Sequence, residues 1–173
     1  MSNCSDPNDI TEALDAAIDA FNGEGHGMPT PEESINSDED WTAQLTKGCK
    51  LLDLAEKPVI DGYDTAIIEL CFGAIERSLE AYALAEGGDT LRDFHDHTKC
   101  YTRAADLGLV SRHTSKRLRQ LYDNNRTDSY YGGNRPTHEQ ADAMRDLARA
   151  IHIHATKQIL EDGVCVCDRL SAY

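Results

Sequence analysis

Apolar residues recur at helical spacing along most of the chain. The first run lies between residues 10 and 21, where they recur at intervals of three and four and so share one helix face: Ile10, Ala13, Leu14, Ala17, Ile18 and Phe21. Pro7 suits the first turn of this helix, and Asn22-Gly23 ends it. No segment shows the strict alternation of a half-buried strand, so the pattern predicts an all-α protein.

Three more helices are predicted between residues 39 and 108. The second spans 39–57, with Trp41 on its apolar face, and Pro58 ends it because proline cannot continue a helix. The third spans 62–86, with Asp61 as its expected N-cap and Gly87-Gly88 as its end. The fourth runs without interruption from Asp89 or Thr90 to about Leu107.

Two helices complete the pattern. Ser111 caps the fifth helix, whose expected inward residues are Leu118, Leu121 and Tyr122. Thr137 and Gln140 have the spacing of a capping box before the sixth helix, 138–162. The inward residues expected on the sixth helix are Ala141, Met144, Leu147, Ala148, Ile151, Ala155 and Ile159. Short turns favour an antiparallel helical bundle of about five to six helices.

Three parts are expected within this bundle. Residues 1–57 form an N-terminal helical hairpin with a Gly/Pro-rich loop at 22–38, residues 58–162 form the main bundle in the same domain, and residues 163–173 form a tail. No run of 18 apolar residues occurs, so no membrane span is expected. The N-terminus has no signal peptide pattern, and the six cysteines do not form a secreted framework, which together indicate a cytoplasmic protein.

The charge is strongly negative for a chain of 173 residues. There are 31 acidic and 17 basic residues, which give a net charge of −14, whereas 40% of the residues are apolar. Such a chain can fold, and its self-repulsion is weakest in concentrated salt. The composition is typical of a halophilic protein with an acidic surface; the alternative is an ordinary acidic protein.

One segment carries the opposite charge. Between residues 108 and 135 there are six basic and two acidic residues, a local charge of +4, so the remaining chain carries −18. Arg112, Lys116 and Arg119 fall at i, i+4 and i+7 and therefore share one helix face. Such a face is a candidate for binding phosphate or RNA. The alternative is that these cations neutralise an acidic helix, for example at Glu76 or Glu80, or an acidic partner protein.

Histidine and cysteine spacing predicts no metal site and no cofactor. His95 and His97, like His152 and His154, are two residues apart, so on a helix they point to different faces. Cys165-Val-Cys167 lacks the spacing of a zinc or redox motif.

The junction over 118–136 gathers residues that suit RNA. Asn125 and Arg126 precede Tyr130 and Tyr131, and Arg135 follows. Arginine can bind a phosphate through two parallel hydrogen bonds, and tyrosine can stack on a base. Tyrosine is, however, a poor general base at neutral pH, because its pKa is near 10.

The segment 65–158 resembles the HEPN superfamily (higher eukaryote and prokaryote nucleotide-binding domains). The resemblance rests on ERSLEAYALAE, on LRQLYDNNRTDSYYGG and on EQADAMRDLARAIHIHA. It implies a small helical bundle that forms a homodimer, and many members of the superfamily are ribonuclease toxins paired with a nucleotidyltransferase antitoxin. Arg126 matches the arginine of the family motif and Thr127 its polar neighbour, whereas Tyr130 or Tyr131 stands where the family has histidine.

The resemblance therefore implies an RNA-binding protein with Arg126 at the phosphate. It also allows a more specific function, a metal-independent endoribonuclease toxin of a toxin–antitoxin or defence system. The alternative is a non-enzymatic helical interaction module, an antitoxin or regulatory subunit, that binds an acidic protein partner.

Overall fold

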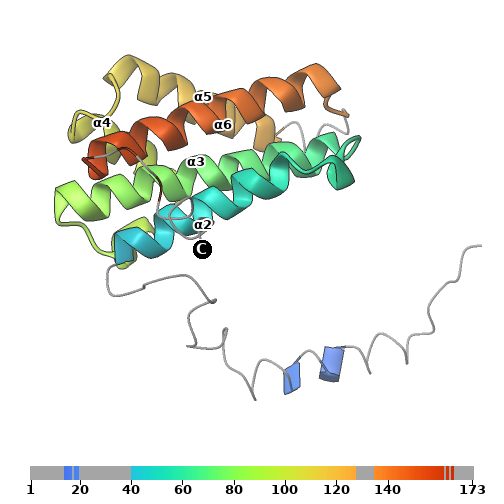
Figure 1. Ribbon diagram of the computed structural model, residues 1–173, viewed down its shortest axis with the longest axis horizontal. Helices are drawn as coiled ribbons and strands as arrows, with labels where there is room; N and C mark the ends of the chain where they lie inside the picture. Colours follow the sequence, from blue (N-terminus) through green and yellow to red (C-terminus); the bar gives the residue numbers. More distant parts are fainter. Residues whose placement is uncertain are drawn as a thin grey trace, which may run out of the picture. The chain divides into compact units, whose positions relative to one another are not determined.

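The computed structural model describes residues 14–16, 18–19, 40–127, 135–161, 163 and 165 (Figure 1). The chain divides into two compact units, Met1–Glu33 and Ser34–Tyr173. In the first unit the described residues are helical, in agreement with the helix predicted there. The predicted loop over 22–38 lies outside the described residues.

The described part of the second unit is built from helices. In chain order these are α2 (Asp40–Ala55), η1 (Pro58–Ile60), α3 (Asp64–Gly87), η2 (Leu91–Phe94), α4 (Lys99–Asp106), α5 (Arg112–Thr127) and α6 (His138–Ile159), where η denotes a 3-10 helix. The residues described contain no strand. The all-α fold class predicted from the periodicity is confirmed. None of the described helices is long and apolar enough to cross a bilayer.

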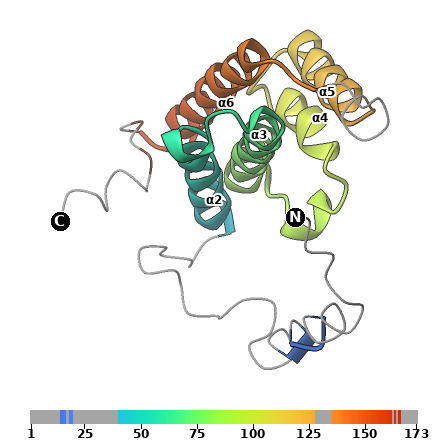
Figure 2. The same cartoon turned by 90° about the vertical axis from the view of Figure 1, so that its right-hand side faces the viewer.

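Helix α3 lies at the centre of this unit, with α2, α4 and α6 packed around it (Figure 2). α2 and α3 run antiparallel and approach closely at Gly48, where a Cβ atom would lie 3.1 Å from Ser78 Oγ. α6 instead runs parallel to α3, because His138 Nδ1 lies 3.2 Å from Asp64 Oδ1 at one end and His152 Nδ1 lies 2.9 Å from Ser78 Oγ further on. The crossover through α4 and α5 makes this parallel arrangement possible.

Helix α5 joins the core through aromatic side chains. Tyr122 packs edge-on against Phe72 of α3, with ring centroids 5.4 Å apart, and lies beside Tyr101 of α4. Leu118 and Tyr122 are buried as expected, but Leu121 is 40% exposed, so its predicted inward position is wrong. Leu121 faces a groove between α5 and α6, described below.

The residues that end the helices largely match the predictions. Ser111 Oγ accepts a hydrogen bond from the Thr114 N–H at the start of α5, and Thr137 and Gln140 form the expected capping box before α6. Gly88 ends α3 in the left-handed conformation, with φ of 65°, that glycine adopts without strain.

Asp61 does not cap α3, contrary to the prediction, because α3 begins after Tyr63. The carboxylate of Asp61 instead lies 2.8 Å from the Arg145 guanidinium of α6. Arg145 also donates through Nε to the carbonyl oxygen of Ala55, at the C-terminal end of α2. One arginine thus satisfies a carbonyl that has no partner within its own helix and holds the α2–α3 turn against α6.

The predicted fourth helix is interrupted. It is divided into η2 and α4, and the residues between them form bends and turns. Asp96 Oδ1 accepts hydrogen bonds from both the backbone N–H and the hydroxyl of Thr98, at 2.9 Å each. This local bonding competes with helical hydrogen bonds, so the chain turns where periodicity alone predicts a continuous helix.

Candidate nucleic-acid interface

The predicted cationic face is present on α5. Arg112, Lys116 and Arg119 are exposed and line a single groove between α4 and α5 with a volume of about 280 Å³. We call this the α5 groove; its lining residues are Thr102, Ala105, Asp106, Arg112, Ser115, Lys116 and Arg119. Ser115 fixes the two helices at this point, because its hydroxyl donates to the Tyr101 carbonyl oxygen at 2.8 Å.

Two acids partly neutralise these cations. Arg112 lies 3.5 Å from Asp106 Oδ1, and Arg119 Nε lies 3.7 Å from Asp123 Oδ2. Both ion pairs are long and solvent-exposed, so each contributes little to stability. A phosphate can therefore replace the carboxylate beside either arginine at a small cost in free energy. Glu76 and Glu80, the acids considered as partners for this face, lie instead against His97 and Arg77.

A second and larger groove lies between α3, α5 and α6. Its volume is about 510 Å³, and we call it the junction groove. Its lining is mostly apolar and consists of Ile68, Phe72, Leu121, Asn125, Arg135, Pro136, Thr137, Gln140, Ala143, Met144 and Leu147. Asn125 and Arg135, ten residues apart in the chain, therefore line the same groove.

The two grooves lie on different faces of α5. At about 100° per residue, Asn125 stands roughly 150° around the helix from the face shared by the three cations. Residue 126 falls within about 40° of Arg112, almost four turns later, and so returns to the cationic face. The predicted site residues thus form two groups, with Asn125 and Arg135 at the junction groove and Arg112, Lys116 and Arg119 at the α5 groove.

The other predicted site residues belong to the end of α5 and to the segment that follows it in the chain. Arg126 and Thr127 belong to the last turn of α5, but their side chains lie outside the described part of the chain. Tyr130 and Tyr131 fall within 128–134, also outside the described residues. Their roles at the phosphate and base remain predictions.

A buried acid–base cluster lies on α3 at Glu76 and Glu80, which the sequence suggested only as ion-pair partners of the cationic face. Glu80 is fully buried, and Arg77 approaches its Oε2 to 2.8 Å, but neither carboxylate oxygen has a hydrogen bond of good geometry. Burial raises the pKa of Glu80 to about 7, against the lowering effect of Arg77. Glu76, one turn earlier, lies 3.1 Å from His97 Nδ1.

This cluster opens to solvent through a cleft of about 300 Å³ lined by Gln44, Arg77, Glu80, Leu91, Phe94, His95 and His97. A carboxyl group with a pKa near neutrality can both accept and donate a proton at physiological pH, as a general acid or base must. Glu76 and Glu80 sit four residues apart, among the apolar residues of the buried face of α3, and this spacing was the available signal. The abundance of acids elsewhere in the chain concealed it.

Together these features define a small all-α domain that carries a cationic groove on an anionic body. The chain belongs to the family described as a domain of unknown function (DUF8154), whose model matches residues 5–167. Neither the curated proteins nor the solved structures gave a match.

Proposed function

We propose that this protein is a HEPN-like RNA-binding domain that holds RNA phosphates along the α5 groove. The observation that carries the proposal is the meeting of Arg112, Lys116 and Arg119 at one groove. A protein with a net charge of −14 repels RNA over most of its surface, so binding needs a local positive site. The exposed cations of α5 provide one.

The chemistry of these side chains favours phosphate. Two of the three are arginines, whose planar guanidinium groups bind phosphate oxygens through paired hydrogen bonds. Arg126 follows on the same side of α5, and the Tyr130–Tyr131 pair comes a few residues later in the chain. Single-stranded RNA is recognised by this combination of cations for the backbone and aromatic rings for unstacked bases.

The proposal extends to cleavage of the bound RNA. Arg126 would stabilise the charge on the phosphate, and Tyr131 or Tyr130, with Asn125 nearby, would occupy the position of the family histidine. A homodimer would bring two such sets together, and a nucleotidyltransferase-type antitoxin would be the partner. Binding is better supported than cleavage, because tyrosine is a weak base at neutral pH.

The test is binding of a fluorescently labelled single-stranded RNA, followed by anisotropy over a series of KCl concentrations. Three phosphate contacts predict a slope of log K against log salt of about −2. Lys116→Ala should weaken binding roughly tenfold at low salt and reduce the slope by about 0.7. Lys47→Ala, an exposed lysine on α2, is the matched control and should bind as the wild type does.

If the wild type binds no RNA at any salt concentration at which its circular dichroism is helical, the proposal is wrong. Cleavage is scored separately, on the same RNA in the presence of EDTA. Arg126→Ala should abolish cleavage there while the helical signal is unchanged. If the wild type binds the RNA but leaves it intact, the protein is an RNA-binding domain and the ribonuclease proposal is wrong.

The alternative function, a helical interaction module, is favoured by the mostly apolar junction groove with the exposed Leu121 beside it. An acidic partner protein would use the same cations on α5, so a competition experiment separates the two. Polyglutamate that displaces labelled RNA only at a large excess supports the RNA proposal. Tight polyglutamate binding without RNA binding supports the interaction module.

A further inference from the structure

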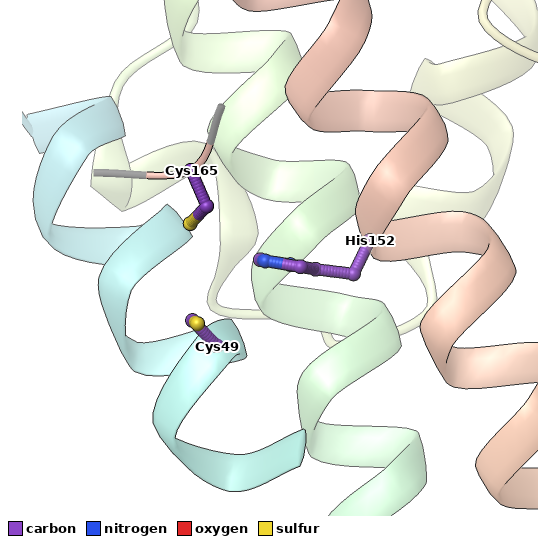
Figure 3. Close-up of side chains that lie close together, drawn as sticks. All are labelled: Cys49, His152 and Cys165. Carbon is purple, nitrogen blue, oxygen red and sulfur yellow. The ribbon is translucent and has the colours of Figure 1, made fainter. Parts of the chain in front are cut away.

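We propose that Cys49, His152 and Cys165 form a binding site for a zinc-type metal ion. One ligand atom from each of the three residues lies within 4.8 Å of the other two. Figure 3 shows the imidazole of His152 pointing from α6 toward the two sulfur atoms, one on α2 and one on the segment that follows α6. Cys49 lies more than 100 positions before His152 and Cys165 in the chain, so no short spacing motif marks the site.

Two of the three proposed ligands are buried. His152 is 5% exposed and Cys165 is 6% exposed. Cys165 packs in a small apolar cluster with Leu45 and Ala81, flanked by Trp41, Cys49, Ile159 and Leu160. Burial restricts these two ligands to few positions, whereas Cys49 is only partly buried, so a water molecule can complete the tetrahedral coordination of the ion.

The hydrogen bonds of His152 leave one ring nitrogen directed at the site. The Ser78 hydroxyl donates its single proton to the Ala74 carbonyl oxygen at 2.7 Å. His152 Nδ1 lies 2.9 Å from Ser78 Oγ, so Nδ1 must carry the proton and donate it to this oxygen. The lone pair then resides on Nε2, a buried atom with no hydrogen-bond partner. A buried polar atom without a partner is costly, and a metal ion would satisfy it.

The donor set selects the metal. Two cysteine sulfurs and an imidazole nitrogen suit Zn²⁺, whereas Mg²⁺ and Ca²⁺ require oxygen ligands. Zinc bonds of about 2.3 Å to sulfur and 2.0 Å to nitrogen would bring the ligand atoms to about 3.5–3.8 Å apart. That contraction of about 1 Å is within the reach of side-chain rotation. Ser78 would hold the ligating ring in place from the far side, as is common for metal-bound histidines.

The charges and protons also balance when the metal ion binds. The thiols of Cys49 and Cys165 each lose a proton to solvent, while His152 binds through a lone pair already present. The dication and two thiolates together are neutral, as a buried site requires. A disulfide between the two cysteines would instead leave His152 Nε2 without a partner, so the geometry favours the metal.

The test uses the full-length, reduced and chelator-treated protein with Co²⁺ as a spectroscopic probe. We expect one equivalent of Co²⁺ to give thiolate-to-metal absorption and the visible bands of a tetrahedral ion, with release of about two protons per ion. Zn²⁺ should displace Co²⁺ and bleach the spectrum. The many surface carboxylates can bind Co²⁺ too, but they give no thiolate band.

Cys49→Ser, Cys165→Ser and His152→Ala should each weaken binding at least a hundredfold or abolish the thiolate band. Cys71→Ala, which alters a fully buried cysteine of the main core, is the matched control and should retain one equivalent. Apo-state circular dichroism separates lost binding from lost folding. Cys49→His, which supplies a nitrogen ligand in place of the thiolate, should bind more tightly than Cys49→Ser.

The proposal is overturned if the folded, reduced wild type gives no thiolate band, or if the three variants bind as it does. A Cys49–Cys165 disulfide, found by peptide mapping in protein that binds no metal after reduction, overturns it in favour of that cross-link.

Discussion

Glu80 shows how one residue can set the pH response of the whole fold. Its carboxyl group is fully buried in α3, near Arg77, Glu76, His97 and Lys47, and burial dominates its environment. The pKa rises from 4.5 to about 7, so the folded protein holds a proton that the unfolded chain has already lost. The stability that proton uptake by Glu80 contributes is complete below pH 4.5 and is lost as the pH rises to about 7.

Glu80→Gln should therefore be more stable than the wild type at pH 8, by about 1–3 kcal/mol, since glutamine mimics the neutral carboxyl group. The difference should shrink toward zero below pH 4.5, where Glu80 becomes protonated in both states. Urea unfolding of the two proteins across this pH range is the measurement. Glu86→Gln, at an exposed position of α3, controls for the loss of one negative charge. A stability difference that does not vary with pH would contradict a raised pKa.

The cysteine–histidine cluster marks a limit of sequence reasoning at the same scale. The helical argument against His152 and His154 acting together is correct for a single helix. In the structure the two residues do separate, since His152 is buried whereas His154 is exposed and lies 3.0 Å from the Leu109 carbonyl oxygen. Cys49 and Cys165 approach His152 only through the packing of three segments, and this packing cannot be predicted from spacing.

At the scale of the helices, local signals predicted the boundaries best where side chains bond to their own backbone. Ser111 and Thr137 were placed correctly because a cap depends on three or four neighbouring residues. Asp61 was misplaced because a carboxylate can cap a helix or form an ion pair, and the distant Arg145 decides between them. The break in the fourth helix is also local, but the turn formed by Asp96 and Thr98 competes with a strong apolar stripe.

Thr137→Ala tests the cap that begins α6. The Thr137 hydroxyl accepts a hydrogen bond from the Gln140 N–H, and the Gln140 side chain accepts one from the Thr137 N–H. Loss of the hydroxyl should lower the free energy of unfolding by about 1 kcal/mol, measured by urea denaturation. Thr65→Ala, at an exposed position in the first turn of α3, should change it by less than about 0.5 kcal/mol. An equal effect of both substitutions would show that the cap is not what stabilises α6.

At the scale of the molecule, the order of the helices in space creates the candidate sites. Because α6 packs in parallel on α3 while α5 is held by α4, α5 and α6 diverge and leave the junction groove between them. The sequence predicted the helices and the cationic face, since both follow from periodicity. The same periodicity places Asn125 and Lys116 on different faces of α5, but which grooves these faces line depends on how α5 is rotated against its neighbours.

The net charge of −14 predicts opposite salt responses for folding and for RNA binding. Salt screens the repulsion among the carboxylates, with a screening length of about 10 Å at 0.1 M and about 3 Å at 1 M, so the unfolding temperature should rise over this range. RNA affinity should fall over the same range, because binding releases cations from the RNA and this release is less favourable at high salt. Thermal unfolding followed by circular dichroism, paired with anisotropy in the same buffers, measures both.

Near pH 4.7, the isoelectric point expected from the sequence, the net charge vanishes and the salt dependence of stability should flatten. An unfolding temperature that stays constant with salt at pH 8 would show that ion pairs such as Arg149–Glu56 already offset the excess of acid.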